Sequence, residues 1–174
     1  MFLFFPFISL LIIFDTGLPL FYKQDRLGKN GEIIRITKFR TMVDDEDNVN
    51  NIETTKEDDQ RVTRIGNFLR KTHLDELPQF ISVLRNDLSL VGPRAEWVKL
   101  VPRYEGKVPF YRARLLVKPG ITGWAQINYG YASTVEETII KLEYDLYYVQ
   151  HRSLLMDLSI HLRTFSYVFQ LKGR

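Results

Sequence analysis

The sequence of 174 residues contains no cysteine and only three histidines. The absence of cysteine excludes disulfides, thiolate nucleophiles and cysteine-based metal sites. The histidines, His73, His151 and His161, do not have the spacing of a metal motif such as HExxH. The sequence also lacks an internal repeat. With 45% hydrophobic and 26% charged residues, it is expected to form one domain with a hydrophobic core.

Charge is distributed unevenly along the chain, although the formal net charge is only +3. Residues 44–59 contain eight acidic residues and one lysine, a net charge of −7, so the rest of the chain carries +10. A basic body favours a polyanionic partner, such as nucleotide phosphates, anionic lipid or nucleic acid. Residues 43–60 combine few apolar residues with many like charges, which predicts a mobile solvated loop without a chemical role.

The N-terminal residues 1–14 are apolar apart from Ser9. As a helix they reach about 21 Å, less than the roughly 30 Å of a bilayer core. No basic residue precedes them and no small-residue cleavage site follows, which argues against a signal peptide. Pro6 is expected to kink the helix. We therefore predict a helix that inserts into the membrane without crossing it, and a buried core helix is the alternative.

Residues 20–24 and 32–40 have the pattern of two strands around a turn that contains Gly28 and Asn30-Gly31. Six basic residues lie on this predicted hairpin: Lys23, Arg26, Lys29, Arg35, Lys38 and Arg40. After a membrane segment, such a cluster is typical of contact with anionic headgroups. Lys38 and Arg40 are alternatively placed to face a substrate phosphate.

Two adjacent carboxylates, Asp75 and Glu76, lie in the segment THLDELPQFISVLRN. Because Pro78 cannot sit deep inside a helix, a helix is expected to begin close to Asp75, with Asp75 as its N-cap. The helix N-terminus would keep this carboxylate ionised and attract phosphate. Capping alone, or a capping box from Thr72 to Asp75, is the alternative. A buried stripe is predicted from Leu77, Phe80, Ile81 and Leu84.

Two basic residues are predicted to flank these acids. Residues 62–71 have the pattern of a short helix that brings Arg70 close to Asp75. The inward-facing residues of this helix are predicted to be Ile65, Phe68 and Leu69. Gly92-Pro93 predicts a tight turn, on which Arg94 is either a bidentate phosphate ligand or simply solvated.

The C-terminal half is predicted to be mainly helical. Residues 96–104 and 109–115 are expected to form short helices, and 118–126 an irregular loop. A capping box over residues 133–136 predicts a helix that continues to about His151 and contains Asp145. Ser153 is expected to cap a last helix, with one apolar stripe of Leu155, Leu158, Leu162, Phe165 and Phe169. Packing of this stripe on the core is the default, and an interfacial helix is the alternative.

Five segments together resemble the monotopic phosphoglycosyl transferases, bacterial sugar transferases that prime glycan assembly. The segments are KFRTM, LRKTHLDELPQF, SLVGPRAE, KPGITGWAQIN and YDLYYVQHRSLLMDL. They occur in the family's order and spacing, which makes the resemblance specific. It implies transfer of a sugar-1-phosphate from a UDP-sugar to polyprenyl (undecaprenyl) phosphate, with Mg²⁺, as the priming step of exopolysaccharide or other glycan synthesis. The implied location is the cytoplasmic face of the bacterial inner membrane, and the implied further partners are membrane lipid and downstream glycosyltransferases.

The resemblance also implies roles for residues. Asp75 is implied to be the nucleophile that forms a covalent phosphosugar intermediate. Asp75 and Glu76 are the candidate metal ligands, and Glu76 is alternatively an orienting group. The residues implied to bind substrate phosphate are Lys38, Arg40, Arg70 and Arg94, and those implied as auxiliary are Gln126 and Asp145. The implied fold is α+β and mostly helical, a membrane-associated single domain with a short β-hairpin. Residues 1–20 form its membrane-inserted part, and 21–174 its catalytic domain with interfacial helices.

The sequence departs from the family pattern in two places. The re-entrant helix hairpin of the family bends at a Ser-Pro pair, whereas here Pro6 follows Phe5 and few residues precede it, so this segment looks shortened. Ala95 follows Arg94 where many members have a second proline. A non-catalytic membrane-bound module that binds nucleotide sugar or lipid phosphate is therefore the alternative function. Nucleic-acid binding ranks last, because only the charge favours it.

Overall fold

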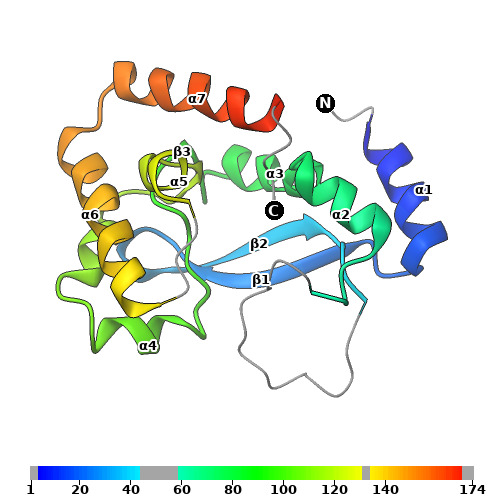
Figure 1. Cartoon of the computed structure of the whole chain (residues 1–174), viewed down its shortest axis with the longest axis horizontal. Coiled ribbons are helices and arrows are strands. Elements are labelled where there is room, and N and C mark those ends of the chain that lie inside the picture. The colour runs from blue at the N-terminus through cyan, green and yellow to red at the C-terminus, as the bar shows by residue number, and fades with distance from the viewer. Residues whose placement is uncertain (1–3, 44–58, 131–133, 170–174) are drawn as a thin grey trace. The chain divides into compact units, whose positions relative to one another are not determined.

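The computed structural model describes residues 4–43, 59–130 and 134–169, the last three without their side chains. Figure 1 shows the elements along the chain. The order is α1 (Phe4–Thr16), β1 (Phe21–Leu27), η1 (Lys29–Gly31), β2 (Ile33–Phe39), α2 (Arg64–Lys71), η3 (Leu74–Glu76), α3 (Gln79–Leu84), β3 (Ser89–Val91), α4 (Val101–Glu105), η4 (Tyr111–Leu116), β4 (Gly120–Thr122), α5 (Trp124–Asn128), α6 (Val135–His151) and α7 (Leu154–Phe169), where η marks a 3₁₀ helix. The predicted loop over 43–60 falls almost entirely outside the described residues.

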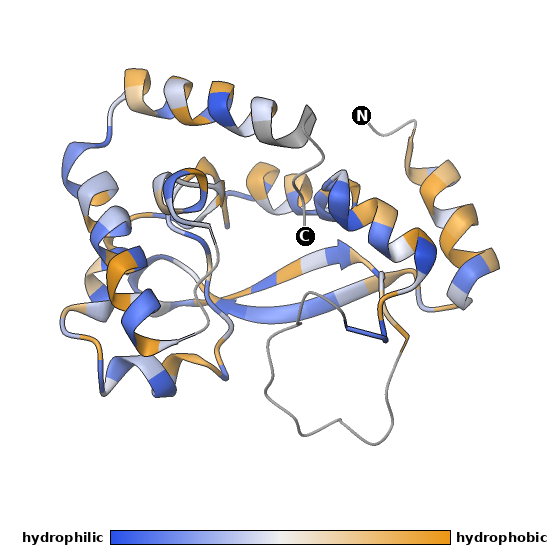
Figure 2. Cartoon of the chain, viewed as in Figure 1, coloured by the Kyte–Doolittle hydropathy of each residue, from blue (hydrophilic) through white to orange (hydrophobic). Residues whose placement is uncertain are grey.

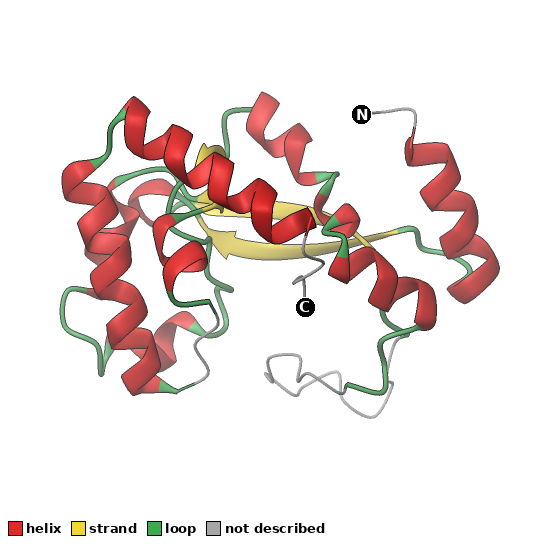
Figure 3. Cartoon of the chain, turned by 45° about the horizontal axis from the view of Figure 1, so that its top comes forward, coloured by secondary structure: helices red, strands yellow, loops and turns green. Residues whose placement is uncertain are grey.

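The chain divides into two compact units, each described here by itself. The first unit contains residues 1–23, 37–80 and 167–174, and the second contains 24–36 and 81–166. The described chain contains helices and two short sheets, joined by loops (Figure 3). The predicted α+β class is therefore confirmed, whereas the predicted boundary near residue 20 stays a prediction.

The predicted hairpin is present as the paired strands β1 and β2, joined through η1. Asn30 and Gly31 have φ values of 56° and 84°, the left-handed conformation that asparagine tolerates and glycine adopts without steric cost. The Gly28 N–H donates to the Glu32 carbonyl at 2.7 Å. The Asn-Gly pair therefore closes the hairpin, as the sequence predicts.

In the first unit, α1 and α2 share a hydrophobic core with the end of β2. Ile8 and Ile12 pack with Phe39 and Leu69, all at most 2% exposed. A Cβ at Gly66 would lie 2.0 Å from the Thr41 carbonyl oxygen, so only glycine permits this approach of α2 to the segment after β2. Helix α2 was expected over 62–71, and its predicted inward residue Phe68 is instead 56% exposed.

Helix α1 is hydrophobic along most of its length (Figure 2). Its exposed large apolar side chains are Phe4, Phe7, Leu10, Ile13 and Phe14. The predicted kink is wrong, because α1 continues through Pro6; proline in the first turn removes an N–H that has no partner within the helix. Across the described ranges, no helix is both long and apolar enough to cross a membrane.

In the second unit, β3 and β4 form a parallel pair that the sequence did not predict. Ser89 pairs with Gly120 and Val91 with Thr122. A Cβ at Gly120 would lie 2.1 Å from the Gly92 nitrogen, so glycine allows the two backbones to meet. The predicted irregular loop over 118–126 is therefore wrong in part, because it contains β4 and the start of α5.

The long helices α6 and α7 begin at capped positions. Thr134 caps α6 in a capping box with Glu137, one residue later than predicted, and Ser133 lies outside the described residues. The Ser153 hydroxyl accepts from the Met156 N–H at 3.2 Å, which confirms the predicted cap of α7.

The short helices expected over 96–104 and 109–115 are present in part, as α4 and η4.

Helix α7 does not bury its predicted apolar stripe, which corrects the default prediction of core packing. The described members of this stripe are all more than half exposed: Leu155, Leu158, Leu162 and Phe165. The helix packs instead through Ile160, which is fully buried, and through the partly buried Met156. The apolar face that the sequence shows therefore points to the surface.

Candidate functional site

Asp75 lies on the short 3₁₀ turn η3 and is not a helix N-cap. His73 precedes this turn in the left-handed conformation, with φ of 56°, and makes no capping hydrogen bond. The Thr72 hydroxyl donates to the carbonyls of Phe68 and Leu69, at 2.8 and 3.2 Å, and so satisfies the end of α2. The N-cap and capping-box interpretations of Asp75 are therefore both wrong, because a reversal at His73 separates α2 from η3.

The apolar stripe predicted after Asp75 is wrong in part: Leu77 packs against the core of the first unit and Phe80 is partly buried, but the other two members are exposed. Leu84 is 77% exposed and Ile81 is 37% exposed, whereas Gln79 and Ser82 are buried. The reason is the starting point of the helix: α3 begins at Gln79, after a turn at Leu77 and Pro78, so its buried face differs from that of a helix begun at Asp75. Polar side chains therefore face inward directly after the acidic pair.

The acidic pair of the first unit meets a lysine. Asp75 is buried, with 7% of its surface exposed. The Glu76 carboxylate forms a hydrogen-bonded ion pair with the Lys38 ammonium, and both side chains are mostly buried. Lys38 belongs to β2, so the fold brings a cation from the hairpin to the Asp75–Glu76 turn. The sequence predicted these three residues in one site, and the structure brings at least Lys38 and Glu76 together.

Arg70 and Arg40 lie at helix ends in the same unit. Arg70 Nε donates to Thr41 Oγ1 at 3.0 Å, which ties the last turn of α2 to the KFRTM segment. Arg40 is buried, and its guanidinium donates to the carbonyls of residues 16, 17 and 18, at 2.5 to 3.1 Å. These carbonyls lie at the C-terminus of α1 and directly after it, where the helix dipole favours a cation. This position favours a structural role, and phosphate binding by Arg40 stays a prediction.

In the second unit, hydrogen bonds fix the turn that contains Arg94. The Gly120 N–H donates to the Pro93 carbonyl at 3.0 Å, and Arg114 Nη2 donates to the Arg94 carbonyl at 2.9 Å. Ala95, which stands where many family members have proline, is 4% exposed and belongs to a hydrophobic cluster. The turn is therefore held by contacts of its backbone and by burial of Ala95 rather than by a second proline.

A buried ionic network surrounds Arg114. Arg114 Nη2 lies 2.7 Å from Asp145 Oδ2, and both residues are at most 4% exposed. Glu96 Oε2 lies 3.8 Å from Arg114 Nη1, and Lys141 is buried nearby on α6. Asp145 was predicted as an auxiliary residue, whereas Arg114, Glu96 and Lys141 were missed. No local signal identifies them: YRARLL contains two arginines, of which Arg112 is exposed and Arg114 buried, and the sequence pattern does not distinguish them.

Burial and neighbouring charges act in opposite directions on this network. Burial raises the pKa of Asp145, although Arg114 and Lys141 oppose the shift. Burial also acts to raise the pKa of Glu96, but the charges of Lys141, Arg114 and Arg26 outweigh it and hold that pKa below its ordinary value. Burial lowers the pKa of Lys141. Burial alone would lower the pKa of Arg114, but its anionic neighbours raise it, so this guanidinium stays charged.

Gln126, the other predicted auxiliary residue, lies on α5. Its Nε2 donates to the Ile121 carbonyl at 3.2 Å. Its buried Oε1 has no hydrogen-bond partner in the part of the chain that the structure describes. The amide therefore retains one acceptor.

The predicted site residues are divided between the two units. The first unit contains Lys38, Arg40, Arg70, Asp75 and Glu76, and the second contains Arg94, Gln126 and Asp145. Within residues 4–43, 59–130 and 134–169, no group of three or more His, Cys, Asp or Glu side chains could hold a metal ion. Asp75 and Glu76 supply two carboxylates, and Mg²⁺ is commonly held by one or two carboxylates together with substrate phosphates.

Comparison with known proteins identifies the family. The model of the bacterial sugar transferases matches residues 1–171, and the chain belongs to this family. The resemblance noted in the sequence is therefore confirmed.

Three curated relatives illustrate the match. The chain is 41% identical over 156 residues to the UDP-N-acetylgalactosamine-undecaprenyl-phosphate N-acetylgalactosaminephosphotransferase of Aeromonas hydrophila, covering 90% of the chain and 37% of that protein. It is 42% identical over 156 residues to the UDP-glucose:undecaprenyl-phosphate glucose-1-phosphate transferase of Escherichia coli K12, covering 88% and 33%. It is 40% identical over 159 residues to the exopolysaccharide production protein PSS of Rhizobium leguminosarum, covering 88% and 80%. The chain thus spans about a third of the length of the first two relatives.

Proposed function

We propose that the chain is a phosphoglycosyl transferase that moves a sugar-1-phosphate from a UDP-sugar to undecaprenyl phosphate, in the priming step of exopolysaccharide or related glycan synthesis. The names of its relatives support this reaction. The observation that carries it is the Asp75–Glu76 turn, which combines a buried carboxylate with a second carboxylate paired to Lys38. The relatives differ in the sugar they are named for, so the sugar stays open.

The first step is an attack by an Asp75 carboxylate oxygen on the phosphorus attached to the sugar. The bond from this phosphorus to the bridging oxygen breaks, and UMP leaves with that oxygen and the bonding electrons. The protein then carries an aspartyl phosphosugar, an intermediate of the kind that divides one difficult step into two. In the second step a phosphate oxygen of undecaprenyl phosphate attacks the same phosphorus. The aspartyl–phosphorus bond breaks, and the free carboxylate of Asp75 is regenerated.

Cationic groups are needed because a carboxylate and a diphosphate repel each other. Lys38 is held by its ion pair with Glu76, the residue next to Asp75 in the sequence. We assign phosphate binding to Lys38 and Arg70, and orientation of Lys38 to Glu76, whereas phosphate binding by Arg94 of the second unit stays a prediction. The carboxylates of Asp75 and Glu76 have the oxygen chemistry that suits Mg²⁺. When bound, this ion would neutralise charge on the phosphate oxygens.

The same proposal places the protein on the cytoplasmic face of the bacterial inner membrane. Two helices support contact with lipid, because α1 and α7 each expose a row of large apolar side chains that a soluble surface rarely carries. An undecaprenyl phosphate keeps its tail in the bilayer and its phosphate among the headgroups. A transferase on this surface would therefore reach the phosphate without extracting the lipid.

Trapping of the intermediate tests the proposal. The full chain in lipid vesicles is incubated with a UDP-sugar labelled in the phosphate next to the sugar, without undecaprenyl phosphate. We expect up to one equivalent of UMP per chain and label bound covalently to the protein, which undecaprenyl phosphate then removes. Asp75→Asn is expected to lose both signals, whereas the matched variant of the exposed Asp87, Asp87→Asn, keeps them.

Two outcomes would contradict the mechanism. Release of UMP by Asp75→Asn at a near-normal rate would exclude this residue as the nucleophile. Binding of a UDP-sugar by the unmodified chain without release of UMP, for every sugar of a panel, would favour the non-catalytic binding module instead.

A further inference from the structure

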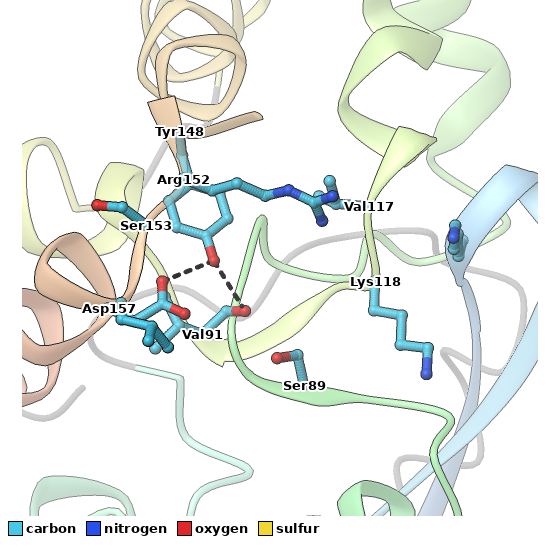
Figure 4. Close-up of a pocket in the computed structure, with 10 residues that line it drawn as sticks. Ser89, Val91, Val117, Lys118, Tyr148, Arg152, Ser153 and Asp157 are labelled. Atoms are coloured by element: carbon cyan, nitrogen blue, oxygen red, sulfur yellow. Dashed lines mark hydrogen bonds between the residues drawn. The ribbon is translucent and has the colours of Figure 1, made fainter. Parts of the chain in front are cut away.

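A pocket of about 370 Å³ in the second unit contains none of the residues assigned to the proposed reaction. Its lining comes from the tip of the hairpin, from β3, from the residues before β4 and from the corner between α6 and α7. Figure 4 shows Arg152, Ser153 and Asp157 on one side of the pocket and Ser89 and Lys118 on the other. The volume lies near the lower end of small-ligand sites, about 300 to 1,000 Å³, and so suits a small polar group.

The charges of this pocket favour an anion. Three cations line it, Lys29, Lys118 and Arg152, against one carboxylate, Asp157. Lys118 donates a hydrogen bond to Asn86. The side chains of Lys29 and Arg152 make no hydrogen bond or ion pair with any described residue. Two cations are therefore available to a ligand.

The single carboxylate is already engaged by a neighbour. The Tyr148 hydroxyl lies 2.9 Å from Asp157 Oδ1 and 3.3 Å from the Val91 carbonyl, to both of which it can donate (Figure 4). Burial and the adjacent Asp157 raise the pKa of Tyr148, so the hydroxyl stays protonated and remains a donor. The Asp157 carboxylate is therefore held by a hydrogen bond from Tyr148.

Neutral donors complete the pocket. The Ser153 hydroxyl accepts from the Met156 N–H, so its own proton is free to donate to a ligand. This serine caps α7, a helix of 16 residues that begins at Leu154 and whose N-terminus favours an anion. The pocket thus offers a hydroxyl proton and a helix dipole in addition to its cations.

The apolar residues at the rim indicate what the anion is attached to. Leu154 lines the pocket and is 88% exposed, and the next residue, Leu155, is 80% exposed. A free phosphate would gain nothing from these side chains. A phosphate ester that carries acyl chains would place its headgroup in the pocket and its chains over the two leucines.

We propose that this pocket binds the phosphate of an anionic phospholipid headgroup, with Lys29, Lys118 and Arg152 as its cationic ligands. The site goes beyond the proposed transfer reaction and does not depend on it, since lipid binding is measured without a UDP-sugar. It would hold α7 at the membrane surface by charge as well as by its apolar face.

The test compares two triple variants of the full chain in binding to phosphatidylcholine vesicles with and without phosphatidylglycerol. The pocket variant is Lys29→Gln/Lys118→Gln/Arg152→Gln. The matched control replaces the same residue types at exposed positions of the same unit, Lys99→Gln/Arg103→Gln/Lys107→Gln. A basic residue at an anionic surface contributes about fivefold to binding. We therefore expect the pocket variant to lose about 100-fold in affinity for the anionic vesicles and the control to lose less than tenfold.

A gain-of-binding variant keeps the test independent of folding defects. Asp157→Asn removes the only negative charge of the pocket and keeps an acceptor for Tyr148. We expect it to bind anionic vesicles about fivefold more tightly and neutral vesicles unchanged. Unchanged or weaker binding to the anionic vesicles would overturn the proposal, as would equal losses in the two triple variants.

The source of the phosphate is tested separately with soluble sn-glycerol 1-phosphate and inorganic phosphate. If either displaces the chain from anionic vesicles only in large excess, the lipid headgroup is supported as the ligand. If either binds the unmodified chain as tightly as the vesicles do, and the pocket triple variant abolishes this binding, the pocket serves a soluble phosphate and the lipid assignment is overturned.

Discussion

In the first unit, Asp75 and Glu76 lie on a single 3₁₀ turn, and Glu76 forms an ion pair with Lys38. The side chains of Glu76 and Lys38 are each partly exposed. In the second unit, Arg114 and Asp145 are almost completely buried. Charges that remain partly accessible are able to exchange a protein partner for a ligand. Charges buried in a network are costly to expose or to leave alone. The comparison separates residues suited to chemistry from residues that hold the structure.

The largest effect on stability is expected from breaking the buried network. Arg114→Met leaves the carboxylate of Asp145 in a site of low polarity without its nearest cation, and it also removes the donor to the Arg94 carbonyl. Loss of one partner from a buried ion pair typically costs about 3–5 kcal/mol. Urea unfolding of the full chain at neutral pH measures this difference.

The double variant Arg114→Met/Asp145→Leu is the control for this experiment. Because it removes both charges, it is expected to regain a substantial part of the lost stability. A loss below about 1 kcal/mol in the single variant would show that the network does not stabilise the second unit.

A somewhat smaller loss of stability is expected for Arg40, which sharpens the comparison within the first unit. Arg40→Ala removes the donors to the carbonyls of residues 16, 17 and 18 at the end of α1. Hydrogen bonds from a charged group contribute about 1.5–3 kcal/mol, so a loss of about 2 kcal/mol is expected by urea unfolding. UMP release by the remaining folded protein should stay near normal. A normal stability combined with a raised KM for UDP-sugar would instead assign Arg40 to phosphate binding.

Lys38 is expected to differ from Arg114 by a large loss of activity combined with a smaller loss of stability. Lys38→Met removes the cation that pairs with Glu76, and this pair is mostly buried but more exposed than Arg114–Asp145. The loss of unfolding free energy should therefore stay below the roughly 3–5 kcal/mol expected for Arg114→Met. UMP release should fall about 10- to 100-fold, because one charge-stabilising contact to the phosphate is lost.

The exposed Lys23 of β1 provides the matched control, since Lys23→Met removes the same charge from the same hairpin. If Lys38→Met lowers stability as much as Arg114→Met and leaves turnover unchanged, the proposed division between the two groups of charges fails.

Local patterns predicted the elements whose determinants lie within a few residues. The Asn30-Gly31 turn and the Ser153 cap are of this kind, because the turn residues and the capping hydroxyl act on neighbouring backbone groups. The segment around Asp75 was interpreted less well. Continuous helical periodicity was assumed there, but the left-handed conformation of His73 interrupts it and resets the buried face of α3.

Interactions between distant parts of the sequence were not predictable from pattern. The strands β3 and β4 are three residues each, too short for a periodic signal, and they pair because glycines let the backbones meet. Arg114 and Asp145 are 31 positions apart, and neither carries a mark of burial. The family resemblance pointed to Asp145 but did not indicate its role. Its partner Arg114 is brought to it only by the packing of α6 against η4.

The smallest effect expected is a change in the pH dependence of stability at Glu96. In the folded protein, the charges of Lys141, Arg114 and Arg26 hold the pKa of Glu96 below its ordinary value of 4.5 despite burial. A carboxylate with a lowered pKa stabilises the fold above its unfolded pKa, and this contribution is lost as pH falls through the folded pKa. Glu96→Gln should therefore lower the free energy of unfolding near neutral pH, and this cost should shrink as pH falls below 4.5.

Asp145 contributes to this pH dependence with the opposite sign. Burial raises its pKa, so ionisation above its ordinary value of 3.8 opposes folding, and acid relieves this cost. Urea unfolding of the unmodified chain and of Glu96→Gln, followed from neutral pH into the acid range, isolates the part due to Glu96. Glu105→Gln serves as the comparison, because Glu105 pairs with the exposed Arg112 and such pairs contribute little. A cost at Glu96→Gln that grows on acidification would mean that burial, rather than the three cations, controls this carboxylate.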